Sequence, residues 1–352
     1  MNALTDSKPK LEVLDALRGF CALAVMLLHL TEMKAHYVIP HGYFPVEYFF
    51  TLTGFTFVYA YDSRWKDMSV WAFFKRRLLR MQPLVILGSL TALVALCFAP
   101  SLRAHFGTAK CPALWIIFLY SCTLLPAPSA WGCIHVLQGP MWTMQYIYVA
   151  NIVYAFVLRH LKTWMLALLA VAAAALSCWM SLQHGRLEAG WVLSGQHVSI
   201  AFTRLAFPVL AGMLIARLGW RIRLGNFALP VTVALLAALF FTPHIADKTT
   251  SALFDAGVAI IAMPLVVMTA AGGTISNAKV AGVCRWLGKF SFPLFATHFQ
   301  FRCVMGNWLK THPNVSTADA VLFGLGTAAV MFAFAYAAMR LVDAFGNWRR
   351  KK

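Results

Sequence analysis

Arg18 and His29 are the residues of the first apolar stretch whose types and spacing could do chemistry together. The segment LDALRGFCALAVMLLHL separates them by eleven positions, and eleven steps of about 100° return a helix to nearly the same face. The guanidinium and the imidazole would then lie about 16 Å apart along that face. An imidazole exchanges protons near neutral pH, and an arginine can hold an anion. The same residues also suit a snorkelling arginine and a histidine bonded across a helix bundle.

Three further arginines stand together in FFKRRLLRMQPL, just before another apolar stretch: Arg76, Arg77 and Arg80. Arginine binds phosphate through paired hydrogen bonds, so the cluster could dock a phosphorylated ligand. Positive charge at the cytosolic end of a membrane span explains the cluster equally well. Both interpretations stay open at this point.

The elements that would position these residues are membrane spans. The chain is 61% hydrophobic and 12% charged, whereas soluble domains carry about 25% charged residues. Apolar stretches of the length that crosses about 30 Å of hydrocarbon recur along residues 1–352, which favours a single all-α integral membrane domain. We predict about ten spans, at 14–34, 45–61, 81–99, 141–158, 163–181, 198–216, 226–242, 251–271, 287–307 and 319–339. The shorter segment 113–125 is expected to be re-entrant or interfacial.

The charges orient this arrangement. With residues 1–13 and the basic tail 340–352 in the cytosol, 22 of the 30 lysines and arginines fall inside, six fall outside, and Arg204 and Arg302 lie within spans. Cytosolic loops collect Lys and Arg, so the net charge of +18 needs no nucleic acid partner. The bilayer is the expected partner, and the first span follows a polar start without a cleavable signal pattern.

The eight cysteines show no ligand spacing, so we expect neither a metal site nor a disulfide framework. Cys111 and Cys133 fall in one predicted outer loop and could pair there.

Five segments resemble motifs of the membrane acyltransferase-3 family, in the family's order from residue 14 to residue 298. LDALRGFCALAVMLLH matches an Arg, ten residues and a His. VEYFFTLTGF resembles an acidic residue followed by FFxLSGF, and FFKRRLLRMQP resembles RRxxRxxP. GPMWTMQYIYVANIVYAF resembles the PxWSLxxE segment, and WLGKFSFPLFATH resembles LGxxSYxxYLxH.

The resemblance implies O-acylation, usually O-acetylation, of a carbohydrate hydroxyl, with acyl-CoA as donor and no permanently bound cofactor. The acceptor would be an exopolysaccharide, O-antigen or other envelope glycan, free or lipid-linked, at a bacterial inner membrane. It implies that His29 is the catalytic base or acyl carrier, assisted by Arg18 and Glu47. Residues implied for substrate or donor binding are Arg76, Arg77, Arg80, Trp142, Gln145, His298 and Arg302.

One position departs from the family pattern. The glutamate five residues after the motif tryptophan corresponds to Ile147, after Trp142. Either Glu47 or another group replaces it, or the enzyme is atypical, or activity is lost.

Three further points stay open. His298 and Arg302 share a helix face and suit either a site or a polar pair satisfied within the bundle. Arg204 needs an acidic partner, for which Glu47 and Asp255 are candidates. A transporter or flippase of lipid-linked sugars, or an inactive acyl-CoA-binding relative, would also carry buried charges, but no inverted repeat of the transporter kind is visible.

Overall fold

The structure, a computed structural model, describes residues 10–32, 38–100, 112–128, 131, 135, 137–192 and 194–350, with the backbone alone at 349–350. The described residues form helices and contain no strand. The α-helices are α1 Glu12–Thr31, α2 Pro45–Tyr61, α3 Val70–Cys97, α5 Leu114–Thr123, α6 Trp142–Phe156, α7 Thr163–His184, α8 Gly195–Arg217, α9 Ala228–Phe240, α10 Lys248–Gly257, α11 Met263–Gly272, α12 Ala278–Thr311 and α13 Thr317–Arg350. A π-helical turn, Val258–Ala262, joins α10 to α11.

The prediction of an all-helical membrane protein is confirmed at a coarse level. Six helical stretches are long and apolar enough to cross a membrane: α1, α3, α7, α8, the α10–α11 stretch and Thr317–Trp348 of α13. Each predicted span overlaps a helix, but α2, α6 and α9 have only 17, 15 and 13 residues. Helix α12 has 34 residues but is not one of the six. The predicted number of ten spans therefore exceeds what length and composition support. The segment 113–125 forms the short helix α5.

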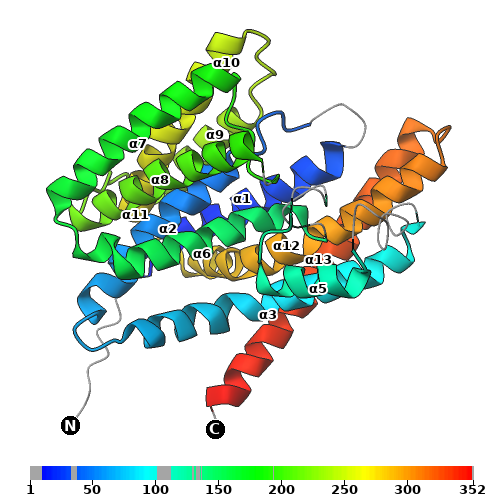
Figure 1. The fold of residues 1–352 in the computed structure, drawn as a ribbon, viewed down its shortest axis with the longest axis horizontal. Helices are drawn as coiled ribbons and strands as arrows, with labels where there is room; N and C mark the ends of the chain where they lie inside the picture. The colour runs from blue at the N-terminus through cyan, green and yellow to red at the C-terminus, as the bar shows by residue number, and fades with distance from the viewer. Residues whose placement is uncertain are drawn as a thin grey trace.

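Helix α1 lies along α12, its most extensive packing partner (Figure 1). The two helices run in the same direction, because Asp15 lies against Gly288 near their beginnings and His29 against His298 further along. A Cβ atom added at Gly288 would come within 2.8 Å of the Asp15 carboxyl group. The absence of a side chain there lets the helices approach closely, as small residues do between membrane helices.

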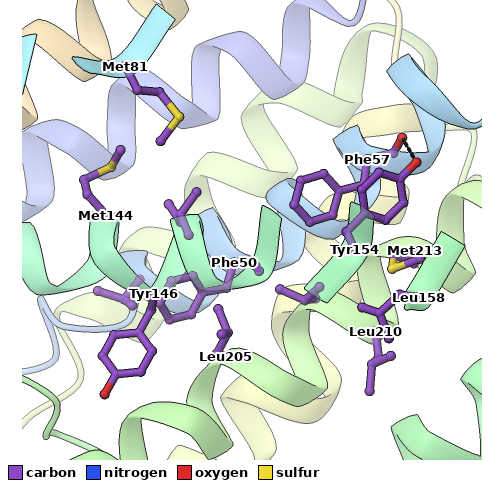
Figure 2. Close-up of a cluster of buried hydrophobic side chains, with 14 of the residues drawn as sticks. Phe50, Phe57, Met81, Met144, Tyr146, Tyr154, Leu158, Leu205, Leu210 and Met213 are labelled. Carbon is purple, nitrogen blue, oxygen red and sulfur yellow. Dashed lines mark hydrogen bonds between the residues drawn. The ribbon is translucent and has the colours of Figure 1, made fainter. Parts of the chain in front are cut away.

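Helices α2 and α8 form the second close pair. A Cβ atom at Gly54 would overlap the backbone of Val209, and one at Gly212 would overlap the backbone of Thr51. The aromatic contacts of α2 then hold α6 in place. The rings of Phe57 and Tyr154 stack with centroids 4.4 Å apart, and the Tyr154 hydroxyl donates to the Phe57 carbonyl (Figure 2).

The loops gather at two ends of the bundle. At one end, which we call the first end, Arg217 at the end of α8 donates to Asp62 after α2 and to the carbonyl of Leu161 before α7. At the opposite end, the far end, Asp255 of α10 accepts from Tyr43 before α2 and from the backbone of Leu187 after α7. The connections therefore alternate between the ends, which brings distant segments of the chain together.

Candidate active site

A cavity of about 150 Å³ lies between α1, α2, α3, α6 and α12. Its cationic wall consists of Arg18, Arg77 and Arg80. The rest of the wall is hydroxyl-bearing or apolar, and comprises Phe49, Leu52, Thr53, Thr56, Met81, Thr143, Met144, Ile147, Ser291, Phe292 and Phe295. Figure 2 shows Met81 and Met144, on facing helices, pointing toward one another. The cavity thus combines a group of cations with an apolar interior.

The arginines of this wall have few anionic partners. Arg18 pairs with Asp15 at 3.0 Å. Arg77 is buried and its guanidinium lies over the Phe57 ring at 5.7 Å, while its Nε atom has no hydrogen-bond partner within the described part of the chain. Arg80 is exposed. Arg77 has a side-chain hydrogen bond with Tyr61 but no carboxylate partner among the described residues, and a buried cation without a counter-charge is costly. This wall is therefore suited to receive an anionic ligand.

Arg76 does not share this environment. It follows Lys75 on α3, is exposed, and does not line the cavity. Of the three arginines singled out in the α3 cluster, the structure brings two to the cavity and adds Arg18 from α1. The period of the helix explains the separation, because Arg76 is turned about 100° away from Arg77.

The other end of α1 carries a second group of polar side chains. His29 Nδ1 lies 3.2 Å from a carboxylate oxygen of Glu32, and the other oxygen of Glu32 accepts from Arg302 at 2.6 Å. The His29 ring stacks on that of His298, with centroids 5.4 Å apart, and meets Phe299 edge-on. His29, His298 and Arg302, three of the residues predicted from the sequence, therefore come together.

Glu32 is the member of this polar group that the sequence interpretation missed. It stands three positions after His29, a spacing that places two side chains on neighbouring positions of a helix surface. The spacing of three residues could therefore have indicated that Glu32 lies beside His29. The structure places Glu32 at the C-cap of α1, directly after its last residue.

His298 is fully buried and its hydrogen bonding fixes its tautomer. Its Nδ1 lies 3.1 Å from the carbonyl oxygen of Leu294 and 3.0 Å from that of Phe295, so this nitrogen carries the proton and donates. Its Nε2 atom, which is then an acceptor, has no partner among the described residues. An unpartnered polar atom next to His29 marks a place where a hydroxyl group could bind.

Phe295 connects the cavity to the histidines. Its ring lines the cavity, meets Phe49 edge-on at 6.0 Å and lies 6.0 Å from the His298 ring. The arginine-lined cavity and the His29 group are thus adjoining parts of one region, arranged along α1 and α12.

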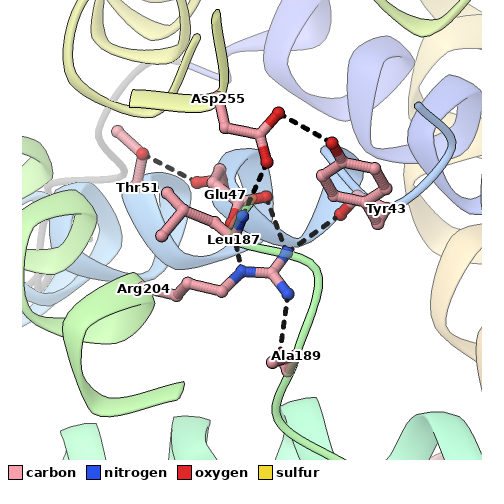
Figure 3. A network of polar contacts seen from close by, with 7 residues as sticks. All are labelled: Tyr43, Glu47, Thr51, Leu187, Ala189, Arg204 and Asp255. Carbon is pink, nitrogen blue, oxygen red and sulfur yellow. Dashed lines mark hydrogen bonds and ion pairs between the residues drawn. The ribbon is translucent and has the colours of Figure 1, made fainter. Parts of the chain in front are cut away.

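Glu47 lies elsewhere, in a buried ion pair with Arg204 (Figure 3). Arg204 Nε and one terminal nitrogen donate to the two Glu47 oxygens at 2.5 and 3.0 Å. The guanidinium also donates to the backbone carbonyls of Ala189 and Tyr43. Of the two candidate partners, Glu47 is therefore the one that pairs with Arg204, while Asp255 joins the network through Tyr43.

Two further predicted residues also lie outside the cavity. Trp142 packs under the Arg204 guanidinium at 5.3 Å, and Gln145 accepts from His135 at 3.1 Å. Their neighbours on α6, Met144 and Ile147, face the cavity instead. The position of the absent glutamate is therefore part of the cavity wall, although Trp142 and Gln145 are not.

The described residues contain no cluster of three or more potential metal ligands. Six described cysteines are free: Cys21, Cys97, Cys122, Cys178, Cys284 and Cys303. Cys111 and Cys133, for which a pairing was considered, lie outside the described residues.

A family model described as an acyltransferase domain, of the third acyltransferase type, matches residues 11–340. Neither the curated proteins nor the solved structures contain a match to the chain.

Proposed function

The chain belongs to the acyltransferase-3 family, and from this we propose that it is a membrane O-acyltransferase acting on carbohydrate. It transfers an acyl group, usually acetyl, from a coenzyme A thioester to a hydroxyl of an exopolysaccharide, O-antigen or other envelope glycan, free or lipid-linked. The family supplies the reaction type. The identity of donor and acceptor belongs to the proposal.

The cavity supports the proposal that acyl-CoA is the donor, because three arginines line one wall of it and its interior is apolar. Coenzyme A bears phosphates at one end and a thioester on a long, slender arm at the other. Arg77, buried without an anionic partner in the described region, matches a phosphate. Arginine holds phosphate by charge-assisted, paired hydrogen bonds. The apolar wall that ends at Phe295 suits the arm and the acyl group.

The proposed orientation follows from the same arrangement. The arginines stand near the beginning of α1, where Arg217 and Asp62 also meet at the first end. If this end faces the cytosol of a bacterial inner membrane, the donor enters from the compartment that contains coenzyme A. The alternation of loops between two ends supports ten crossings in which short helices such as α2 and α6 also span. Both termini are then cytosolic.

The chemistry centres on His29. Its Nε2 takes the proton of the acceptor hydroxyl, whose oxygen attacks the thioester carbonyl carbon. A C–O bond forms, the C–S bond breaks, and the departing thiolate takes the proton back from the imidazolium. A positioned general base of this kind contributes roughly 10²–10⁴-fold. A variant of the scheme passes the acyl group through His29 itself.

The decisive experiment uses purified protein in lipid nanodiscs with labelled acetyl-CoA and an envelope glycan as acceptor. Mass spectrometry of surface glycans from cells with and without the gene identifies the acetylated hydroxyl. We expect donor-dependent acylation that disappears in His29→Ala. Movement of lipid-linked sugar without acylation would indicate a transporter, and donor binding without turnover would indicate an inactive relative.

A further inference from the structure

We propose that Glu32, held by Arg302, is the carboxylate that positions His29 for catalysis. The proposal rests on the proposed function and assigns a role to two side chains near the end of the α1–α12 pair. Glu32 is a positioning residue, because it acts through the imidazole and need not touch the substrates.

The contact of Glu32 determines which nitrogen of His29 is available. A carboxylate only accepts hydrogen bonds, so the 3.2 Å contact requires that His29 Nδ1 carries the proton. The lone pair then lies on Nε2, which makes no hydrogen bond to another described residue. The side chain of His29 keeps 19% of its surface exposed, so the imidazole is not sealed inside the described part of the bundle. A buried carboxylate fixes the catalytic tautomer of histidine in the same way in hydrolases.

Arg302 restrains the carboxylate from its other side. Its guanidinium donates to the second Glu32 oxygen at 2.6 Å and lies over the Phe299 ring at 5.4 Å. Each oxygen of Glu32 therefore has its own partner, which limits rotation of the carboxylate. The negative charge also stabilises the imidazolium that forms when His29 takes up a proton.

The stacked His298 ring restricts His29 from a third direction. Its Nδ1 is already engaged with the backbone of α12, so it does not compete for Glu32. The two histidines therefore have the same tautomer, with the proton on Nδ1, but His29 donates to a carboxylate and His298 donates to main-chain carbonyls.

Other carboxylates do not fit this role. Glu47 directs both oxygens to Arg204, and Asp15 pairs with Arg18 near the beginning of α1. Within the described residues, the carboxylate that contacts His29 is that of Glu32. The position that carries Ile147 therefore does not leave His29 without an acidic neighbour.

The test compares Glu32→Gln, Glu32→Asp, Arg302→Gln and the double Gln variant in nanodiscs. Gln can still accept a hydrogen bond from Nδ1 but lacks the charge. We expect kcat to fall roughly 10²–10⁴-fold in Glu32→Gln, with KM for acyl-CoA changed less than about twofold. Asp keeps the charge on a shorter side chain, so Glu32→Asp should recover part of the loss. Glu12→Gln, which removes a partly exposed carboxylate of α1 that pairs with Arg285 of α12, is the matched control and should keep normal kcat.

The double variant tests whether Arg302 acts through Glu32. In that case Arg302→Gln lowers kcat in the wild-type background, but changes it by no more than about twofold once Glu32 is already Gln. If the losses of kcat in the two single variants multiply in the double variant, Arg302 does not act through Glu32. Normal kcat in Glu32→Gln, or loss of acyl-CoA binding in parallel with kcat, would overturn the positioning role. Because Glu32→Asp and Arg302→Gln alter the pair separately, failure of one variant to accumulate leaves the comparison intact.

These results are separable from a failure of the proposed function. If His29→Ala abolishes acylation while Glu32→Gln keeps it, the function stands and the role of Glu32 falls. If wild-type protein transfers no acyl group, the proposed function falls, and the positioning role that depends on it falls too. If wild-type protein transfers the acyl group and His29→Ala keeps full activity, the function stands, but the catalytic role of His29 and the positioning role of Glu32 both fall.

Discussion

The rings of His29 and His298 stack with centroids 5.4 Å apart and join α1 to α12, about 16 Å along the helix from Arg18. Because the two helices run in parallel and approach closely at Gly288, this contact lies on the same continuous interface as the beginning of the arginine-lined cavity. The histidines are thus tied to the cavity by rigid helix packing. Displacing either helix would alter both places at once.

The two histidines should respond differently to substitution. His29→Ala should remove acylation at unchanged protein level, because the general base is lost, while donor binding persists. His29→Gln should be nearly as inactive, since Gln can hydrogen-bond but cannot take the proton. His298→Ala should cost about tenfold through loss of the stacked ring and its acceptor nitrogen. Initial rates in nanodiscs measure these losses, and near-normal acylation in His29→Gln would mean that the imidazole only forms a hydrogen bond.

Substitutions of the arginines on α3 distinguish a role in acyl-CoA binding from a role in membrane orientation. Arg77→Gln should weaken acyl-CoA binding about 10- to 100-fold, since a charge-assisted hydrogen bond is worth about 1.5–3 kcal/mol. The salt dependence of binding should also become shallower. Arg76→Gln is the matched control, because Arg76 is exposed and lies outside the cavity. Titration with a labelled acyl-CoA over a range of salt concentrations measures both effects. Equal affinities of the two variants for acyl-CoA would mean that the arginine cluster only orients the protein in the membrane and does not bind the donor.

A substitution at Ile147 should change the affinity for acyl-CoA rather than the reactivity of the His29 imidazole. It shares the cavity wall with Arg18, Arg77 and Arg80, so Ile147→Glu would add a carboxylate that pairs with these arginines and repels phosphate. We expect weaker acyl-CoA binding in Ile147→Glu, and a smaller change in Ile147→Gln, which has a similar size without charge. Isothermal titration distinguishes them. A gain of activity in Ile147→Glu would instead mean that the site retains a function for an acid at this position.

The predicted orientation can be tested with single cysteines in a functional variant that lacks the native ones. Ser63, Thr249 and Asn347 are all exposed. Cysteines at Ser63 and Asn347 should react with an impermeant maleimide only after the inner membrane is opened. A cysteine at Thr249 should react once the outer barrier alone is opened. The reverse pattern would exclude the ten-crossing arrangement with cytosolic termini.

The sequence predicts the candidate site best where its residues lie on a single helix, because their spacing then determines whether they share a face. Arg18 and His29 share a face of α1 because eleven residues complete about three turns, and hydropathy locates the helices because a bilayer demands long apolar stretches. The choice among carboxylates could not be made in this way. Glu47 and Arg204 are 157 positions apart, and their pairing depends on how α2 packs on α8. Glu32 was missed although the predicted span 14–34 contains it, because its contact with Arg302 depends on how α1 packs on α12.

Trp142 and Gln145 illustrate a second limit. Their segment was identified correctly as a helix, but the rotation of that helix about its axis depends on contacts such as Phe57 with Tyr154. That rotation directs Met144 and Ile147 to the cavity and Trp142 to Arg204. A sequence motif fixes the spacing of its members, whereas packing decides which of them face the site.

The last prediction concerns the ion pair of Glu47 and Arg204, whose side chains are each 1% exposed. Removing one partner from a buried pair leaves an uncompensated charge and typically costs about 3–5 kcal/mol. Glu47→Gln should therefore lower the thermal unfolding temperature and the amount of folded protein, while the protein that remains folded keeps its rate per molecule.

The double variant Glu47→Gln with Arg204→Met should recover part of the stability, because the unpaired cation is also removed. Glu12→Gln, which breaks an exposed pair with Arg285, should change stability by less than about 1 kcal/mol. Thermal unfolding of purified protein, followed by rates normalised to folded protein, measures both quantities. A large loss of rate at normal stability in Glu47→Gln would instead return Glu47 to the catalytic role that its sequence position suggested, and would require the α2–α8 network to communicate with His29.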